Sequence, residues 1–298
     1  LTRKRVRRLV IIIIMGLIAI NFTNVFTVLQ RSTNQTEFFT YPEIIAHRGA
    51  SDDAPENTLA AVELALEQEA DAIEIDVQMT EDGKVVLMHD KTLGRTTDDS
   101  QNRYVRDVTY EEIRRLDAGS WFSSDFEGEK VPALEEVLEL VGRRADLFIE
   151  LKDGSQAMNE RVVELIESYN LESTSSILSP SESQLDAIKA LNDDIQTVML
   201  ISTFYGNINS LINDESIDHF ALGFAFYINN DEYVTTMHDS GRKVYAWTVN
   251  TEDTIASLSR RNVDGLITDR PVFAREQAYL KNASDFTTTV LELLFEND

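Results

Sequence analysis

Short apolar runs alternate with amphipathic segments along most of this chain of 298 residues. Apolar runs of four to six residues that are bounded by turns are typical of buried strands. We expect strands at 44–47, 73–77, 147–151, 175–178, 196–200, 219–223, 243–248 and 265–268. Helical patterns lie at 58–69, 134–143, 156–169, 182–191, 208–212, 231–240, 252–261 and 272–280. Eight alternating units predict an α/β fold, a closed parallel TIM (β/α)8 barrel, with a doubly wound open sheet as the alternative.

A hairpin interrupts this alternation after the second expected strand. Asp82 and Gly83 stand between two apolar runs, and an Asp-Gly pair in that position predicts a two-residue type I′ turn. Counting outward from this turn pairs Asp76 with His89. The returning arm at 84–88 would be antiparallel, so it lies outside the set of parallel barrel strands.

The segment at 91–130 lacks this periodicity and is too long for an idle connection in a compact domain. It follows the second strand on the side where barrel enzymes carry their sites, so we expect it to cap the site. Trp121 and Phe122 within it either contact the substrate or anchor the insertion. The tendency of aromatic side chains to bury favours anchoring.

Two acidic residues occupy the second expected strand. Glu74 and Asp76 are two positions apart, so their side chains share one face of the strand. Ile73, Ile75 and Val77 form the opposite face, which indicates that the strand is buried on both sides. A solvated hairpin with incidental charges is the alternative, but it leaves this apolar face unexplained. Two buried carboxylates require a positive partner.

Four short motifs lie in order around this strand: His47-Arg48-Gly49, Asn57-Thr58, Glu74-x-Asp76 and His89-Asp90. Their order and spacing resemble the glycerophosphodiester phosphodiesterase family, in its bacterial, membrane-anchored type, over about 43–280. The resemblance implies a TIM-type barrel, one divalent cation and two catalytic histidines. It also implies hydrolysis of glycerophosphodiesters to glycerol 3-phosphate and an alcohol.

Carboxylates at the ends of two strands are available for that cation. Glu150 ends the third expected strand, and the carboxyl ends of barrel strands converge on one mouth. Glu74, Asp76 and Glu150 match the metal-ligand positions of the resembled family, and oxygen-only ligation favours Mg²⁺ or Ca²⁺. For Glu150, a salt bridge to Lys152 is the alternative.

His47 and His89 are the candidate acid and base, because imidazole exchanges protons near neutral pH. One histidine would activate the nucleophile, which is either water or the adjacent hydroxyl of the glycerol. The other would protonate the leaving alkoxide, and the residues leave the assignment open. The resemblance favours His89 as the base and His47 as the acid. We expect the remaining histidines, His219 and His238, to be structural.

Basic and aromatic side chains near the same strand ends are candidates for substrate binding. Arg48 and Lys152 would contact the phosphate and offset the negative charge that develops on it. Trp247 either faces the glycerol carbons or packs in the core. We expect Asp269 to be a structural cap and Asn57 to be the N-cap of the first helix.

Composition narrows the possible sites and partners. There are no cysteines, so disulfides and thiolate metal sites are excluded. The formal net charge is −25, and it is about −30 without the five cations near the N-terminus. An acidic surface repels nucleic acid, so we expect no nucleic-acid partner. A phosphate substrate must then be captured by a local positive site.

The N-terminus has the pattern of a membrane anchor. Five lysine and arginine residues lie within 1–8, and the stretch 9–29 is apolar apart from Asn and Thr. Its length, together with the lack of a small-x-small cleavage site, favours an uncleaved single-pass transmembrane helix over a signal peptide. The basic flank should stay cytoplasmic, which places the catalytic part outside the cell. Because the chain begins with Leu1, it is either a fragment of a longer protein or starts at a misread position.

These features divide the chain into a basic flank at 1–8, a transmembrane helix at 9–29, a linker at 30–42, a catalytic barrel at 43–281 and a tail at 282–298. Two other functions stay open. One is a phospholipase or lysophospholipase D-type enzyme that acts on intact lipids, and the other is a non-catalytic barrel that only binds. The complete set of histidines, carboxylates and cations argues against the non-catalytic barrel.

Overall fold

The computed structural model describes residues 41–202, 208–223 and 232–280. Among these, Pro42–Ala278 form one compact unit around a nine-stranded sheet. The strands are β1 (Glu43–His47), β2 (Ala72–Met79), β3 (Val85–Leu87), β4 (Asp146–Leu151), β5 (Ser175–Ser179), β6 (Gln196–Ile201), β7 (His219–Gly223), β8 (Val244–Trp247) and β9 (Gly265–Thr268). Strand β1 pairs in parallel with both β2 and β9, so the sheet closes. The predicted eight-stranded parallel barrel is therefore confirmed, and β3 is an antiparallel addition to β2.

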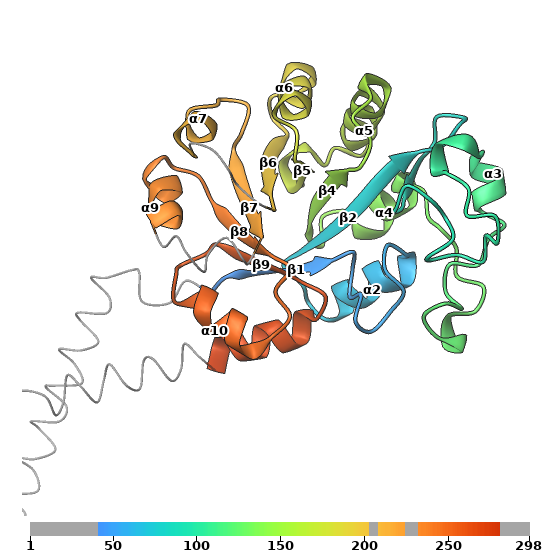
Figure 1. Ribbon diagram of the computed structural model, residues 1–298, viewed down its shortest axis with the longest axis horizontal. Coiled ribbons are helices and arrows are strands. Elements are labelled where there is room, and N and C mark those ends of the chain that lie inside the picture. The colour runs from blue at the N-terminus through green and yellow to red at the C-terminus, as the bar shows by residue number, and fades with distance from the viewer. Residues whose placement is uncertain (1–40, 203–207, 224–231, 281–298) are drawn as a thin grey trace, which may run out of the picture. The chain divides into compact units, whose positions relative to one another are not determined.

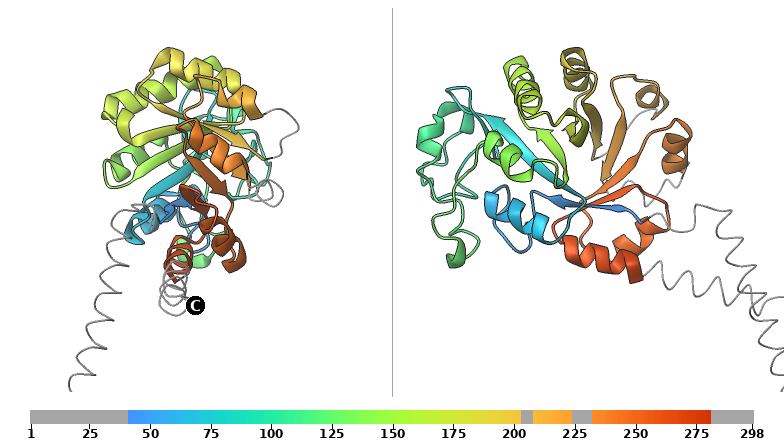
Figure 2. Two further views of the ribbon diagram at one scale, coloured as in Figure 1. Left: turned by 90° about the vertical axis from the view of Figure 1, so that its left-hand side faces the viewer. Right: turned by 180° about the vertical axis from the view of Figure 1, so that it is seen from behind.

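Helices cover the outside of this barrel (Figure 1, Figure 2). They are α2 (Leu59–Glu67), α3 (Tyr110–Ile113), α4 (Leu134–Val141), α5 (Gln156–Tyr169), α6 (Glu182–Leu191), α7 (Ile208–Ile212), α9 (Glu232–Asp239) and α10 (Glu252–Ser259). Residues 271–280 are helical as well. Apart from α3, which lies in the insertion, each helix coincides with a helical pattern of the sequence.

The start of α2 differs from the prediction. Thr58 is the N-cap, and its Oγ1 accepts a hydrogen bond of 3.2 Å from the backbone N–H of Ala61. Asn57 has a left-handed backbone (φ 57°), whereas an N-cap residue needs an extended one. The prediction that Asn57 caps this helix is therefore wrong.

The barrel interior is filled by side chains from successive strands. One cluster of buried residues consists of Ile45, Ala72, Phe148, Leu178, Val198, Leu200, Ala221, Tyr245 and Ile267. The rings of Phe148 and Tyr245 meet edge to face with centroids 5.0 Å apart. Burying one such large side chain stabilises the fold by about 1.5–3 kcal/mol. Two larger clusters lie between strands and helices, so the strands are buried on both faces, as a parallel barrel requires.

The hairpin after β2 has a different register from the predicted one. Strand β3 pairs so that Val77 faces Leu87, and the backbone N–H of Met88 donates to Asp76 O at 3.0 Å. The loop therefore holds three residues instead of the predicted two. Three-residue hairpin loops consist of a type I turn followed by one left-handed residue, and Gly83 takes that position (φ 79°). The prediction that His89 pairs with Asp76 is wrong, since Met88 occupies that place.

The insertion at 91–130 contains α3 and two short 3-10 helices, Val105–Asp107 and Ser124–Phe126. A small core of its own joins it to β3, with Val86, Met88, Leu93, Val105, Val108, Ile113, Ala118 and Val131 buried together. Trp121 Nε1 donates to Ala118 O at 2.8 Å, and its ring meets that of Phe122 edge to face at 5.7 Å. These contacts lie within the insertion, but Trp121 is 40% exposed, so the burial expected of an anchoring residue is not observed for it.

The expected basic flank, transmembrane helix and most of the linker lie outside the described residues, and so does the tail at 282–298. Within the described ranges, no helix has the length and apolar character needed to cross a membrane. The N-terminal anchor stays a prediction.

Candidate active site

The site lies where β1, β2 and β4 end, at the mouth of the barrel where catalytic residues of this fold gather. The turn after β1 begins with Arg48 and Gly49, which both have positive φ angles of 57° and 81°. A Cβ on Gly49 would lie 2.6 Å from the carbonyl carbon of Ala61, so only glycine lets α2 pack here. This tight turn directs the backbone N–H of Arg48 to Glu74 Oε2, at 2.9 Å.

The three predicted metal ligands come together. Glu74, Asp76 and Glu150 each offer a carboxylate oxygen, and these oxygens lie within 4.8 Å of one another. Glu74 and Asp76 are 2% and 1% exposed. Burial, followed by the negative charge of Asp76, raises the pKa of Glu74 to about 8 and also raises the pKa of Glu150. Three carboxylates this close repel one another, so the cluster fits a bound divalent cation, which would offset their charge.

Two cations surround Asp76. Lys152 Nζ lies 3.0 Å from Asp76 Oδ1 and 2.5 Å from Glu150 Oε1. Glu150 therefore belongs to the acidic cluster, as predicted for a metal ligand, and it also forms the salt bridge to Lys152 that was the alternative. Arg48 Nε lies 3.1 Å from Asp76 Oδ2, yet it makes no hydrogen bond and is buried. A buried donor without a well-aligned acceptor costs free energy, and the nearby charge of Asp76 offsets part of that cost. Asn57 Nδ2 also donates to Asp76 Oδ2, at 2.8 Å, which explains its left-handed backbone.

His47 is held by a carboxylate that the sequence did not identify as a partner. Its Nδ1 donates to Asp269 Oδ1 at 2.5 Å, which leaves Nε2 on the side of Glu74, 4.0 Å away. Asp269 is fixed in turn by Asn250 Nδ2 at 2.5 Å and by Ser51 Oγ at 3.1 Å. Burial lowers the pKa of His47, but the hydrogen bond to Asp269 and the charge of Glu74 outweigh it and raise that pKa overall. Asp269 thus orients a histidine, and the prediction of a structural cap is wrong.

His89 is also held by a carboxylate, and that carboxylate belongs to a series of charged side chains linked by hydrogen bonds. Its Nδ1 donates to Asp90 Oδ1 at 2.8 Å, and Arg95 Nε donates to Asp90 Oδ2 at 2.6 Å. Arg95 also binds Glu56, which accepts a further hydrogen bond of 2.8 Å from Arg48. The hydrogen bond from Arg95 lowers the pKa of Asp90 to about 2. Burial lowers the pKa of His89, despite the nearby negative charges.

The arrangement offers two imidazoles whose Nδ1 atoms are tied to carboxylates, so that Nε2 is the free nitrogen of each. It also offers two cations and an acidic cluster for a divalent ion. This is the equipment for acid–base cleavage of a phosphate ester with electrostatic stabilisation of the developing charge. A barrel that only binds a ligand would not need two oriented histidines.

Comparisons with known proteins agree with this chemistry. Residues 47–272 match the model of the Glycerophosphoryl diester phosphodiesterase family. The chain belongs to this family. A glycerophosphodiester phosphodiesterase of Caldanaerobacter subterraneus is 37% identical over 233 residues, which cover 76% of this chain and 94% of that protein. One from Bacillus subtilis is 34% identical over 245 residues, which cover 76% and 83%.

A solved structure is also similar. The phosphodiesterase of Oleispira antarctica, in complex with the product sn-glycerol-3-phosphate, is 28% identical with a TM-score of 0.72. The match covers 80% of this chain and 96% of that chain. As a member of the glycerophosphoryl diester phosphodiesterase family, the present chain is an enzyme that hydrolyses glycerophosphodiesters.

Three residues singled out in the sequence, Trp247, His219 and His238, lie outside the cluster of histidines and carboxylates. Trp247 Nε1 donates to Ala221 O at 3.0 Å, and the ring packs against the barrel interior, which supports core packing. His219 begins β7 and therefore lies at the end of the barrel opposite the site. His238 Nε2 pairs with Asp264 at 2.8 Å, and Asp264 precedes the first residue of β9 at that same opposite end. The structural assignment of both histidines agrees with these positions.

The orienting role of Asp269 predicts a kinetic effect of its substitution. Asp269→Asn is expected to lower kcat by about 100-fold, because an amide offers its own N–H to Nδ1 and disturbs the orientation and proton state of His47. KM should change little, since Asp269 acts through the histidine and contacts no substrate. Steady-state kinetics on a glycerophosphodiester measure both constants.

Asp264→Asn is the matched control, because it removes a carboxylate from a histidine pair at the opposite end of the barrel. It should leave both constants unchanged. If Asp269→Asn raises KM while kcat keeps its wild-type value, Asp269 serves binding and the orienting role is wrong.

Proposed function

We propose that this enzyme cleaves glycerophosphodiesters to glycerol 3-phosphate and an alcohol through His47 and His89, aided by one divalent cation. The observation that carries the proposal is the pair of imidazoles oriented at Nδ1 by Asp269 and Asp90, beside the acidic cluster. The product named in the related Oleispira antarctica structure, sn-glycerol-3-phosphate, supports the same substrate class.

The proposed proton transfers assign one role to each histidine. His89 accepts the proton of the attacking hydroxyl, either of water or of the adjacent glycerol carbon, as the oxygen bonds to phosphorus. The bond from phosphorus to the alcohol oxygen breaks, and His47 donates a proton to that oxygen. If the glycerol hydroxyl attacks, a cyclic phosphate forms first and water opens it in a second step. Arg48 and Lys152 hold the phosphate oxygens throughout.

The divalent cation would be held by Glu74, Asp76 and Glu150. Their oxygen-only set suits Mg²⁺ or Ca²⁺ and does not suit metals that prefer sulfur or nitrogen. When bound, such an ion supplies positive charge that polarises a phosphate oxygen.

Metal removal tests the proposal directly. Protein treated with EDTA is expected to release glycerol 3-phosphate from glycerophosphocholine and glycerophosphoethanolamine at less than about 1% of the original rate, because a metal contributes several kcal/mol to the transition state. Added Mg²⁺ or Ca²⁺ should restore the rate, and the more effective ion identifies the physiological candidate. An enzyme that keeps its full rate in EDTA contradicts the metal's role, and one that is silent with every metal contradicts the activity.

Hydrolysis of intact lipids has less support. A phospholipase needs an apolar surface beside the site for acyl chains, whereas the cavity next to Lys152 is lined mostly by polar and charged side chains, among them Lys91, Arg106 and Asp153. Lysophosphatidylcholine in the same assay distinguishes the two activities, and we expect no choline release from it.

We also propose that residues 9–29 anchor the enzyme in a membrane with the barrel outside the cell. The proposal rests on the apolar stretch and its basic flank in the sequence. The full chain should stay in the membrane pellet after an alkaline carbonate wash, and external protease should degrade the barrel in intact cells. Recovery of the chain in the wash contradicts the anchor.

A further inference from the structure

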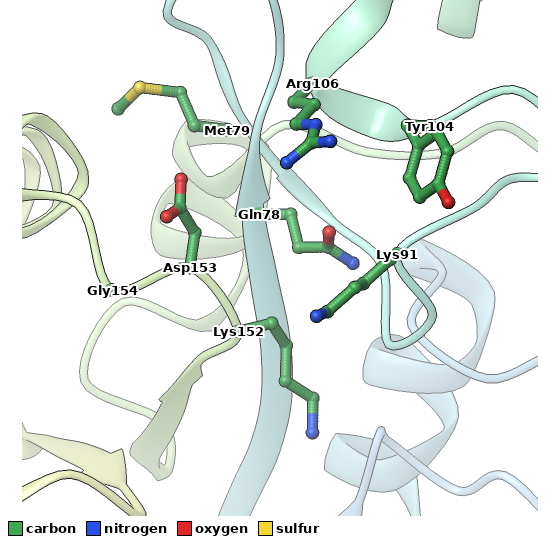
Figure 3. Close-up of a pocket in the computed structure, with 8 residues that line it drawn as sticks. All are labelled: Gln78, Met79, Lys91, Tyr104, Arg106, Lys152, Asp153 and Gly154. Atoms are coloured by element: carbon green, nitrogen blue, oxygen red, sulfur yellow. The ribbon is translucent and has the colours of Figure 1, made fainter.

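The cavity next to Lys152 adjoins the catalytic site. Its volume is about 230 Å³, and it lies between the ends of β2 and β4 and the insertion. Its lining includes Gln78, Lys91, Tyr104, Arg106, Lys152 and Asp153 (Figure 3). A single water needs only about 10–15 Å³ of such space, so the cavity has room for a group of several atoms.

Two of the lining residues connect this cavity with the reaction centre. Lys152 contributes its side chain to the cavity wall while its Nζ lies 3.0 Å from Asp76 Oδ1. Gln78 Nε2 donates to Met88 O at 2.9 Å and to Asp90 O at 2.5 Å, on either side of His89. A diester whose phosphate lies at Lys152 and His89 therefore has this cavity beside it, within reach of one of its two arms.

The cavity is positively charged in a chain of net charge −25. Lys91 makes no side-chain hydrogen bond or ion pair with any residue in the described ranges, and Figure 3 shows its side chain reaching into the space between Gln78 and Lys152. Arg106 stacks over the Tyr104 ring at 5.1 Å, and its only ion pair within those ranges is an exposed one of 3.7 Å to Asp107. These two cations are thus available to an anionic ligand.

Asp153 is the acidic residue of the lining, and its charge offsets that of one cation, so the lysine and arginine side chains of the lining still outnumber it. Asp153 Oδ1 accepts a hydrogen bond of 3.0 Å from the backbone N–H of Ser155, and Oδ2 accepts one of 3.1 Å from its hydroxyl. Its carboxylate is therefore engaged in the turn before α5. Figure 3 shows the Asp153 side chain extending away from the end of Lys152.

We infer that this cavity receives the alcohol arm of the diester and that the preferred alcohol carries a second anionic group, a phosphate or a carboxylate. The inference rests on the proposed function and specifies its substrate class. An anion there gains charge-assisted contacts with Lys91 and Arg106, whereas a quaternary ammonium such as choline is repelled by both.

Two matched substrate pairs test the inference. The first pair is glycerophosphoglycerol and the same diester with a phosphate on its terminal hydroxyl. The second pair is glycerophosphoethanolamine and glycerophosphoserine, which differ by one carboxylate. We expect kcat/KM to be about tenfold or more higher for the anionic member of at least one pair, because hydrogen bonds to charged groups are the strong ones. The phosphate pair and the carboxylate pair distinguish the two kinds of anion.

The variant Lys91→Gln/Arg106→Gln should remove this preference by lowering kcat/KM for the anionic member of the pair to about that of its counterpart with an uncharged arm. Arg115→Gln is the control, because Arg115 is an exposed cation of the same insertion that pairs with Glu111 and does not line the cavity. It should keep the preference of the wild type.

Three outcomes overturn the inference. Equal rates within both pairs exclude an anionic arm, and a preference that survives in the double variant assigns it to other residues. A preference lost equally in Arg115→Gln reflects the overall charge of the insertion. These outcomes differ from failure of the proposed function, in which no diester of either pair is cleaved with any metal.

Discussion

Replacing Asp76 with asparagine is expected to lower kcat/KM for glycerophosphodiesters by about 10³-fold or more, because the metal's charge stabilisation depends on this carboxylate. Burial alone would raise the pKa of Asp76, but the positive charges of Lys152 and Arg48 outweigh it and hold that pKa below its ordinary value. Asp76 is therefore ionised at neutral pH. Initial rates over a Mg²⁺ and Ca²⁺ series, with calorimetric titration of each metal, measure the loss of activity and of binding.

Asp146→Asn is the matched control for Asp76→Asn. Asp146 is the first residue of β4, so it lies at the end of the barrel opposite the site, and its loss should leave the rate unchanged. Because Asp76 is buried among charges, circular dichroism must show that the variant folds. Glu150→Gln provides a second test, since the Glu150 side chain is 19% exposed and tolerates change more easily. A folded Asp76→Asn enzyme with more than about a tenth of the wild-type kcat/KM contradicts the metal assignment.

His47→Ala and His89→Ala are each expected to lower kcat by about 10²–10⁴-fold, the usual contribution of a positioned acid or base. The substitution removes the proton donor or acceptor and leaves Asp269 or Asp90 without its imidazole partner. His238→Ala is the control, because that imidazole pairs with Asp264 away from the site. Release of glycerol 3-phosphate under saturating substrate measures the effect.

A substrate with a good leaving group separates the acid from the base. The p-nitrophenyl ester of glycerol 3-phosphate releases a phenolate that needs no proton, so loss of the acid should matter little. We expect His47→Ala to recover to within about tenfold of the wild-type rate on this ester, while His89→Ala stays slow. If His89→Ala recovers on this ester and His47→Ala stays slow, the two roles are exchanged. If each variant loses the same rate on both substrates, the division into acid and base is wrong.

The repeating units of the barrel follow from local patterns in the sequence. Each strand is a short apolar run because it is buried on both faces, and each helix shows one apolar stripe because it packs on the barrel from outside. The pair Glu74 and Asp76 was recognisable for the same reason, since the period of two in a strand assigns both carboxylates to one face. Such periods depend only on near neighbours along the chain.

The hairpin shows where local patterns stop being sufficient. Asp82-Gly83 is compatible with a two-residue turn and with a three-residue loop, and the two differ by one position in register. Gly83 takes the left-handed position of the longer loop, so Met88 faces Asp76 and is buried in the core of the insertion. Packing of that small core, which involves residues far along the insertion, decides the register.

By itself the sequence determined the barrel, the family and the groups proposed to perform the chemistry, because these depend on hydrophobic periods and on motifs read in order. Only the tertiary structure decided how the histidines are oriented. Asp269 is 222 residues from His47 and reaches it because β9 pairs with β1 when the barrel closes. The chain of Asp90, Arg95 and Glu56 likewise exists only after the insertion folds back over the turn that follows β1. Contacts between distant segments leave no period in the sequence, so the closed fold is needed to place them.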